Sequence, residues 1–203
     1  MFLFLIFGLT MVSCQAIGKL TTSVPLRTQE GQTWMKTIAP VEQLLAKVFS
    51  MVSPKLHQAV VEVMLKVRWD DLQIGSQTWA RDQIVETAWK WPGATPGISV
   101  ISNRATMCHM DIKGHKEWYD LLVAAGTYEE CWFRLPDLDL DLKYLPGTIV
   151  AFNGRFLRHE VVEWKGGDRV CYAHWVRPTL LRALSIDLPP WVTQSEYLDY
   201  FNN

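Results

Sequence analysis

Three side chains that commonly bind transition metals occur in two short stretches of this chain. The stretch "CHMDIKG" contains His109 and Asp111, where a strand is expected to end, and "GRFLRHEVVEW" places His159 at the expected start of another strand. Residues two apart on a strand point to the same face, so His109 and Asp111 can reach one ion. Two histidines and one carboxylate on one side of a metal leave other positions open, as in non-haem Fe(II) oxygenases.

A candidate anion-binding residue, Arg169, follows His159 by ten residues and comes directly after the turn sequence "KGGD". A hairpin of this length would bring Arg169 back beside the histidine strand. A guanidinium there can bind a carboxylate through two parallel hydrogen bonds, as a dicarboxylate co-substrate requires. Taken singly, His109 is more often structural and Arg169 more often a turn-exit charge. The prediction of a metal site beside an anion-binding arginine therefore depends on the order of the motifs: H-x-D, then His, then Arg.

Composition limits the class of protein. The chain has 203 residues, 49% of them hydrophobic, with a net charge of −1, which suits one globular domain with a sizeable core. This charge argues against a surface coated with basic residues for nucleic acid, although segment 155–182 carries +3 and segment 117–141 carries −6. The four cysteines are scattered and form no C-x-x-C pair, so we expect them to be reduced and mostly in the core.

Residues 1–36 form a poorly defined N-terminal segment. The run "MFLFLIFGLTMVSCQA" has the apolar stretch and small-residue end of a secretory signal but no basic residue before it. The alternatives are a buried strand and a misassigned start inside a longer protein. The run is too short to cross a bilayer, and no other stretch is long and apolar enough to do so.

Helical periodicity covers residues 37–91. The pattern puts Val41, Leu44, Leu45, Val48 and Val52 on one apolar stripe, with Pro40 in the first turn. A second helix restarts after a Ser-Pro pair, and a third opens at a plausible Ser76 cap. The sequence "WPGATPG" then ends the helical part.

Short β-branched or aromatic runs separated by turn residues fill residues 97–177. Seven such runs favour a sandwich, a jelly roll or a small barrel. The acidic residues of "DLDLDLKY" alternate with leucines and are better explained as solvated than as a calcium loop. Residues 178–203 are expected to be helix and loop. The prediction is one α+β domain over residues 37–203, with helices packed on an antiparallel β core.

The segments around these residues resemble a known family. The words "ISNR", "WYDLL", "PGT", "LRH", "GDR" and "CYAHW", together with the H-x-D, are similar to those of the fungal oxygenases related to TET and J-binding proteins. The resemblance covers residues 97–177 and, more loosely, the helical lead-in. It implies a double-stranded β-helix that binds Fe(II) through His109, Asp111 and His159, with Arg169 on the distal carboxylate of 2-oxoglutarate.

The resemblance also implies the reaction and its partners. Such enzymes use Fe(II), 2-oxoglutarate and O₂, and in TET and J-binding enzymes the oxidised group is the methyl of 5-methylcytosine or thymine in DNA. A base methyl lies within the stacked duplex, so the nucleotide has to be flipped out. DNA with a methylated base is the expected partner, with a nuclear or intracellular location. A signal sequence in residues 1–16 would instead make the protein secreted, which contradicts DNA as substrate.

Several residues have two interpretations. Asn103 and Tyr119 either line the co-substrate or serve as a strand end and a core residue, and Cys171 either touches the co-substrate or packs in the core. His174 is expected to be structural, and His115 to lie in a loop. Relatives commonly carry Gly after the distal histidine where this chain has Glu160. This departure leaves two alternatives open: an inactive β-helix that binds or scaffolds, and the same chemistry on RNA, protein or a small molecule.

Overall fold

The computed structural model describes residues 5–10, 13–16, 19–69 and 78–202. The helices are α1 (Gln29–Val52), α2 (Pro54–Trp69), α3 (Thr78–Lys90), α4 (Pro178–Ala183) and α5 (Gln194–Asn202), with 3₁₀ turns η1 (Val24–Arg27) and η2 (Pro136–Leu138). The strands are β1 (Leu5–Thr10), β2 (Ser13–Ala16), β3 (Lys19–Thr21), β4 (Gly97–Ser102), β5 (Thr106–His109), β6 (Asp120–Leu135), β7 (Leu140–Lys143), β8 (Ile149–Phe152), β9 (His159–Val161) and β10 (Trp164–Trp175).

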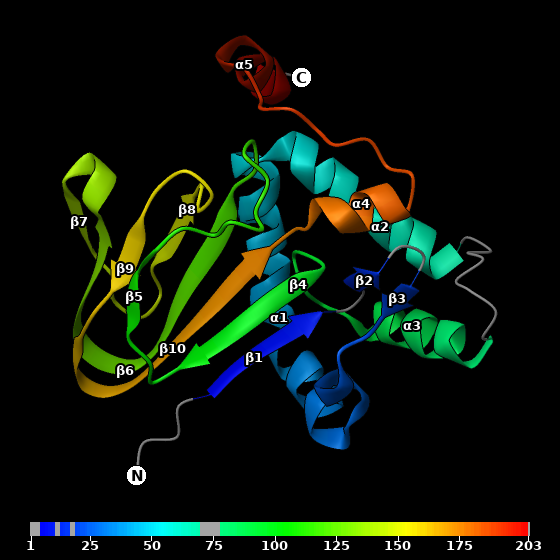
Figure 1. Cartoon of the computed structure of the whole chain (residues 1–203), viewed down its shortest axis with the longest axis horizontal. Coiled ribbons are helices and arrows are strands. Elements are labelled where there is room, and N and C mark those ends of the chain that lie inside the picture. The colour runs from blue at the N-terminus through cyan, green and yellow to red at the C-terminus, as the bar shows by residue number, and fades with distance from the viewer. Residues whose placement is uncertain (1–4, 11–12, 17–18, 70–77, 203) are drawn as a thin grey trace.

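One strongly curled antiparallel sheet holds the functional part of the chain (Figure 1). Its strand order is β1-β4-β10-β6-β9-β5, and β7 and β8 also pair with β6. The short strands β2 and β3 form a separate pair. Helices α1 to α3 lie to one side of the sheet, so the expectation of an α+β fold with helices packed against an antiparallel β core is confirmed. Among the described residues, no helix has both the length and the apolar character needed to cross a membrane.

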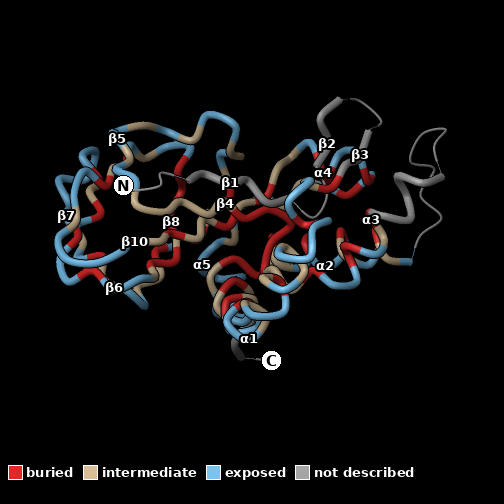
Figure 2. Tube along the Cα trace, turned by 90° about the horizontal axis from the view of Figure 1, so that it is seen from below, coloured by how far each residue is buried: buried red, intermediate tan, exposed pale blue. Residues whose placement is uncertain are grey.

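Among the described residues, the two larger of three apolar cores hold these layers together, and Figure 2 shows the buried stretches gathering where helices meet the sheet. The first core joins the helices to β4, β6 and the C-terminal segment, with Phe49, Val63, Ile98, Leu121 and Leu181 fully or almost fully buried. The second fills the inside of the curled sheet and contains Tyr128, Phe133, Tyr144, Phe152 and Val161. The second core supports the strands that carry the candidate metal ligands.

The first helix differs from its prediction. It begins at Gln29, where the Thr28 hydroxyl accepts a hydrogen bond from the Gly31 N–H, so Pro40 lies inside the helix and not in its first turn. The buried residues of α1 are Met35, Glu42, Leu45 and Phe49, whereas Val41 and Leu44 of the predicted stripe are more than half exposed. The prediction failed because it counted only apolar residues, and the face toward the sheet contains an acid.

That acid, Glu42, joins α1 to the sheet. Its carboxylate lies 3.0 Å from Nε2 of His174 on β10 and accepts a hydrogen bond from the Ala94 N–H at 2.9 Å. Nδ1 of His174 faces the carbonyl of Leu121 at 3.4 Å. Both side chains are buried. His174 is therefore structural, as expected from its place in a strand.

The strand boundaries also differ from the seven predicted runs. The runs "WYDLLVAA" and "ECWFRL" belong to one 16-residue strand, β6, which passes through Gly126 without a turn. Gly126 has φ +124, and a Cβ there would lie 2.0 Å from the Asp168 carbonyl oxygen. Glycine therefore serves a close strand contact here, and the two predicted runs form one strand. Residues 5–10, which had been open between a signal sequence and a strand, contain β1, paired with β4.

Replacing Glu42 by alanine should destabilise the fold, because the variant leaves His174 and the Ala94 N–H without their buried partner. We expect a loss of about 3 to 5 kcal/mol in the free energy of unfolding, measured by urea denaturation. Glu86→Ala is the matched control, since Glu86 pairs with Lys90 on the exposed surface of α3. It should change stability by less than about 0.5 kcal/mol. Equal effects of the two variants would contradict a structural role for the buried pair.

Candidate metal and co-substrate site

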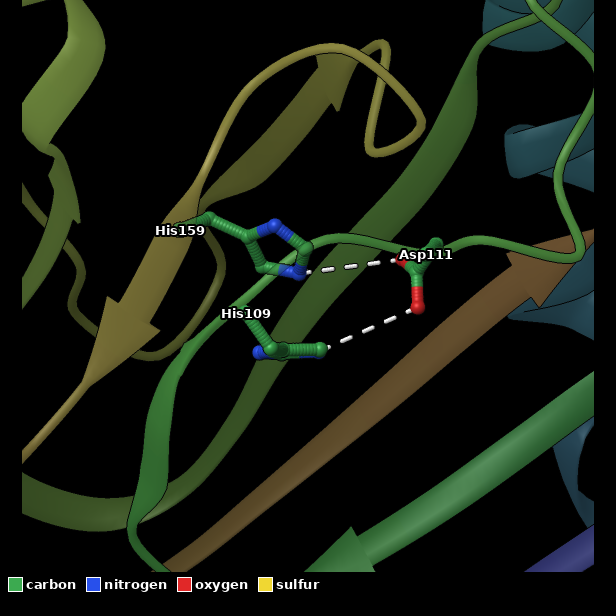
Figure 3. Close-up of side chains that lie close together, drawn as sticks. All are labelled: His109, Asp111 and His159. Carbon is green, nitrogen blue, oxygen red and sulfur yellow. Dashed lines mark ion pairs between the residues drawn. The ribbon is translucent and has the colours of Figure 1, made fainter.

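The three predicted ligands converge in the structure (Figure 3). His109 ends β5 and is the register partner of His159, which begins β9, while Asp111 lies in the loop after β5. Nε2 of His109 is 3.8 Å from Asp111 Oδ1, and Nε2 of His159 is 3.7 Å from Asp111 Oδ2. One ligand atom from each side chain lies within 4.8 Å of the other two. Within the described parts of the chain, this is the only group of three metal-binding side chains so placed.

Both histidines are held in the tautomer that metal binding needs. Nδ1 of His109 donates to the Met107 carbonyl at 2.8 Å, and Nδ1 of His159 donates to the Leu157 carbonyl at 3.2 Å. A carbonyl can only accept, so the proton sits on Nδ1 in each ring and the Nε2 lone pair faces Asp111. Burial lowers the pKa of His159, opposed by its backbone hydrogen bond to Leu157. The neutral imidazole is the form that binds a metal.

The spacing of the donor atoms fits one small divalent ion. Ligand atoms that share an ion at about 2.1 Å lie about 3 to 4 Å apart, and the two measured pairs fall in this range. The side chain of His159 is only 6% exposed, whereas those of His109 and Asp111 are each 39% exposed. The ion would thus be anchored on one buried imidazole and open toward the cavity. The residues present fit an iron of the two-histidine, one-carboxylate type.

Asp111 is positioned by the loop after β8. Its backbone N–H donates to the Gly154 carbonyl at 2.8 Å, and a Cβ added at Gly154 would lie 2.6 Å from Asp111 Oδ2. The amide of Asn153 fixes this loop by accepting from the N–H groups of Arg155 and Phe156 and donating to the Lys116 carbonyl. Gly154 is required because any side chain would occupy the space of the Asp111 carboxylate.

Arg169 lies on β10 with only 2% of its surface exposed. Its Nη1 donates to the Arg104 carbonyl at 3.0 Å, and its guanidinium carbon is 5.8 Å from the Tyr144 ring centroid. Nε is buried and has no hydrogen-bond partner, and no carboxylate of the described residues forms an ion pair with this guanidinium. A buried cation without a counter-ion is costly. The arrangement is suited to an anionic ligand.

A cavity of about 140 Å³ connects Arg169 with the triad. A volume of this order accommodates one small organic molecule. Its walls come from β4, β5, β6, β9 and β10. The lining residues include Asp120, Cys171, Trp175 and Arg177. Arg169, Cys171 and Ala173 alternate along β10 and face this cavity together. The predicted residues of both kinds, metal-binding and anion-binding, therefore border the same space.

The route by which Arg169 arrives there differs from the prediction. A hairpin between the His159 and Arg169 strands was expected, but β9 pairs with β5 and β6, whereas β10 pairs with β4 and β6. β9 and β10 do not pair with each other: both pair with the long strand β6, at Glu160↔Arg134 and from Trp164↔Cys131 onward. Arg169 faces the triad because the sheet curls, and not because its strand is the neighbour of the histidine strand.

The secondary candidates have separate positions. The Asn103 amide accepts from the Arg169 N–H and donates to Asp168 Oδ1, both at 2.8 Å, so it holds the backbone beside Arg169. Cys171 lines the cavity, its Sγ 3.4 Å from the Tyr144 hydroxyl, and burial raises the pKa of its thiol. Tyr119 lies elsewhere, against Trp191 with ring centroids 5.7 Å apart, and does not border the cavity.

Glu160 and His115 also have clear positions. Glu160, the departure from the family pattern, is half-buried with its carboxylate 3.8 Å from Nη1 of Arg134, although it contributes to the cavity wall. His115 packs on Trp118 with ring centroids 4.5 Å apart. Neither belongs to the group of three metal-binding side chains.

Asp120 is the main residue that the sequence did not indicate. It begins β6, lines the cavity, and lies close enough to Gly154 that a Cβ there would be 3.3 Å from its Oδ2. Burial, reinforced by the negative charge of Asp111 and opposed by Arg177, raises its pKa to about 7. The only signal in the sequence was an acid inside the otherwise apolar run "WYDLLVAA".

Comparison with known proteins assigns the chain to a class. A two-histidine, one-carboxylate group with open positions is typical of non-haem Fe(II) oxygenases, and the family matched here consists of 2-oxoglutarate- and Fe(II)-dependent dioxygenases, which also use O₂. Residues 20–178 match the family model described as the oxygenase domain of the 2OGFeDO superfamily, Tet_JBP. The chain belongs to this family. No curated protein sequence matches it.

One solved structure supports the fold, and two others align with part of the chain. The chain is similar to the structure titled "NgTET1 in complex with 5mC DNA" at a TM-score of 0.62 and 12% identity, covering 98% of this chain and 69% of that one. A Cupin 2 conserved barrel domain protein from Salinispora arenicola aligns at a TM-score of 0.33 and 18% identity, over 44% and 69% of the two chains. The polyketide cyclase RemF from Streptomyces resistomycificus aligns at 0.30 and 17%, over 52% and 67%. The first likeness confirms the jelly-roll type of architecture.

Gly154→Ala should weaken metal binding without unfolding the protein, because the new methyl group displaces the Asp111 carboxylate. We expect the affinity for Fe(II) to fall by about 10- to 100-fold in an anaerobic titration. Gly147→Ala is the control: Gly147 also has a positive φ, at +90°, but no atom lies within 4 Å of its added Cβ. That variant should lose some stability and keep its metal affinity. An unchanged affinity in Gly154→Ala would contradict the assigned role of Asp111.

The raised pKa of Asp120 predicts a pH effect on the metal-free protein. The carboxyl ionises near pH 4 when unfolded but near pH 7 when folded, so the folded state holds the extra proton between these values. Stability should therefore fall as pH rises from about 4 to about 7. Asp120→Asn removes this slope and should gain roughly 1 to 2 kcal/mol over wild type at pH 7.5, after allowance for solvent screening. Urea denaturation in the presence of a chelator, at pH 5 and at pH 7.5, measures the free energy of unfolding of both proteins. The same change in this free energy between the two pH values in wild type and in Asp120→Asn would refute the raised pKa.

Proposed function

We propose that His109, Asp111 and His159 hold the Fe(II) of this dioxygenase and that Arg169 binds the distal carboxylate of 2-oxoglutarate. The observation that carries the proposal is the buried Arg169 guanidinium without a counter-ion in the same cavity as the triad. When bound, iron and 2-oxoglutarate would supply the chemistry that oxidises a C–H group with O₂. The residues of the chain would bind and orient the co-substrate and the substrate and would exclude side reactions.

The cavity gives these residues distinct tasks. Arg169 offers a charged contact in the cavity and is backed by the Tyr144 ring, and the Asn103 amide holds the backbone at Arg169. Because Cys171 stays a neutral thiol, it adds no charge that would compete for the guanidinium. The two half-exposed ligands, His109 and Asp111, face the side from which a substrate arrives.

We further propose that the substrate is the methyl group of a modified base in DNA, 5-methylcytosine or thymine. The segments that flank β5 support contact with a polyanion: Arg104 before β5 and Lys113 after it are exposed, and Arg155 donates to the Ile112 carbonyl at 2.6 Å. Met107 and Ile112 in the same part of the chain are 84% and 70% exposed. Apolar side chains beside basic ones suit contact with a duplex from which one base has been flipped. Action on DNA would place the protein in the nucleus.

The titled partner of NgTET1, 5mC DNA, agrees with this substrate but belongs to that protein. The same chemistry on RNA, protein or a small molecule would use the same triad and Arg169. Glu160 gives no support to an inactive scaffold, because its carboxylate is engaged with Arg134 at 3.8 Å and not with the triad.

The experiment for the metal and co-substrate is an anaerobic titration of Fe(II) and 2-oxoglutarate, followed by their visible charge-transfer band. Wild type should develop the band and His159→Ala should not. Arg169→Met should weaken 2-oxoglutarate binding by about 100-fold, the loss of a charge-assisted, bidentate contact. It should remain folded, because a buried cation is replaced by an apolar chain of similar length.

Arg182→Met is the matched control, since Arg182 is exposed on α4 and does not border the cavity. It should bind 2-oxoglutarate as wild type does. A folded wild type without the band, or an Arg169→Met variant with normal 2-oxoglutarate affinity, would refute the assignment. Turnover on duplexes with and without 5-methylcytosine, read by mass spectrometry, tests the DNA substrate separately.

A further inference from the structure

A second cavity, of about 600 Å³, lies beside the start of β6 and has no part in the proposed reaction. Its walls come from the junction of α1 and α2, the segment just before β6, Ala151 of β8, and the C-terminal segment 190–197. Among the described residues it shares none with the cavity that contains the triad: the neighbours Tyr119 and Asp120 line different cavities. A volume of this order suits a small ligand or one long side chain. The second cavity is therefore a separate candidate binding site.

Aromatic side chains form much of its wall. The described residues that line it include Trp118, Tyr119, Trp191 and Tyr197. Tyr119 and Trp191 meet edge to face, with ring centroids 5.7 Å apart and ring planes inclined by 64°. Trp118 is buried, whereas Trp191 is 43% exposed and Tyr197 36% exposed. Exposed aromatic surface gathered at a cavity is typical of a binding site, and the face of an aromatic ring attracts a cation.

The C-terminal wall of this cavity is fixed at both ends. Nε1 of Trp118 donates to the Pro189 carbonyl at 2.9 Å, just before the lining segment begins. At the other end Thr193 caps α5: its N–H donates to the Glu196 carboxylate at 2.9 Å, as in a capping box. The same carboxylate pairs with Lys55 of α2 at 2.6 Å. The wall is thus in place before a ligand arrives, which lowers the entropic cost of binding.

The charge in the cavity is negative. Among the described residues that line it, Glu117 is the only one that is charged at pH 7. No described residue forms a hydrogen bond or an ion pair with the Glu117 carboxylate. Burial lowers the pKa of the neighbouring His115 more than Glu117 raises it, so this imidazole is neutral at pH 7 and provides no counter-ion. The cavity is therefore suited to a cation and not to a phosphate or a carboxylate.

We propose that this second cavity binds an organic cation with a trimethylammonium group, held against the aromatic rings and near the Glu117 carboxylate. A nitrogen that carries four carbon substituents has no N–H to donate, so aromatic faces satisfy it without hydrogen-bond acceptors. A primary ammonium is strongly hydrated and brings three donors, for which a largely aromatic wall offers few acceptors. Small quaternary ammonium compounds and trimethylated lysine side chains share the chemistry that the cavity would recognise.

The test is isothermal titration calorimetry of the full chain with two probes, choline and a short peptide that contains one trimethyllysine. Each probe has a matched control. For choline it is 3,3-dimethylbutan-1-ol, in which carbon replaces the charged nitrogen, and for the peptide it is the same sequence with unmodified lysine. We expect at least one probe to bind, about 10-fold or more tightly than its control. The probe with the higher affinity shows whether the source is a free compound or a protein side chain.

Substitutions locate the bound cation. Trp191→Ala should weaken binding of the preferred probe about 10-fold, and Trp191→Phe, which keeps a ring, should retain most of the affinity. Glu117→Gln should weaken it about 5-fold, as expected for a partly exposed charge pair, without changing the binding of the control compound. Trp89→Ala and Glu86→Gln are the matched controls, because both residues lie on α3, outside the cavity, and Trp89 is 50% exposed. Both should bind the probe as wild type does.

Three results would overturn the inference. Absence of binding by both probes would refute the site. Controls that bind as tightly as the probes would show an apolar cavity without preference for a trimethylammonium group. Full affinity in both Trp191→Ala and Glu117→Gln would place the cation elsewhere on the protein. None of these results bears on the iron or 2-oxoglutarate assignments, because the two cavities have no described lining residue in common.

Discussion

The shared strand β6 is the constraint on which the site depends. It pairs with β7, β8, β9 and β10, so strands from both walls of the cavity are attached to the same 16 residues. The Asp168 carbonyl approaches so closely at Gly126 that no side chain would fit. A strand that curls through such a contact brings β5 and β9 over β10. His109 and His159 then face Arg169 although their strands are not its neighbours.

The curled sheet concentrates charges that are costly without ligands. Arg169 is buried with Nε unsatisfied, and the proximity of Asp111 contributes to the raised pKa of Asp120. Under the proposed function, a divalent cation at the triad would offset the charges of Asp111 and Asp120, and a dicarboxylate would offset the Arg169 guanidinium. Ligands that bind only the folded state stabilise it in proportion to their affinity and concentration. The same buried charges that lower the stability of the free protein thus favour its cofactor and co-substrate.

The residues of the candidate site could be predicted from the sequence. The contacts between segments far apart in the sequence could not. The order of His109, Asp111, His159 and Arg169 predicted one cavity because residue types limit the chemistry. The predicted pairing of β9 with β10 was wrong: "KGGD" lies inside β10 and forms no turn, and no local pattern reveals that both strands pair with β6 and not with each other. The buried face of α1 was predicted wrongly because it contains Glu42, whose partner His174 lies 132 positions later in the sequence. Asp120 escaped notice because its environment comes from other strands.

The helical layer also limits how a large substrate can reach the iron. Through the Glu42–His174 contact, α1 is fixed to β10, whose residue His174 contributes to the cavity wall. The helices therefore close that side of the sheet (Figure 1). On the other side, β5 and the loop after it carry half-exposed His109 and Asp111 between the exposed apolar side chains of Met107 and Ile112. If the substrate is DNA, as proposed above, a duplex is too wide to enter a cavity of about 140 Å³, and a single extruded base would have to approach past β5.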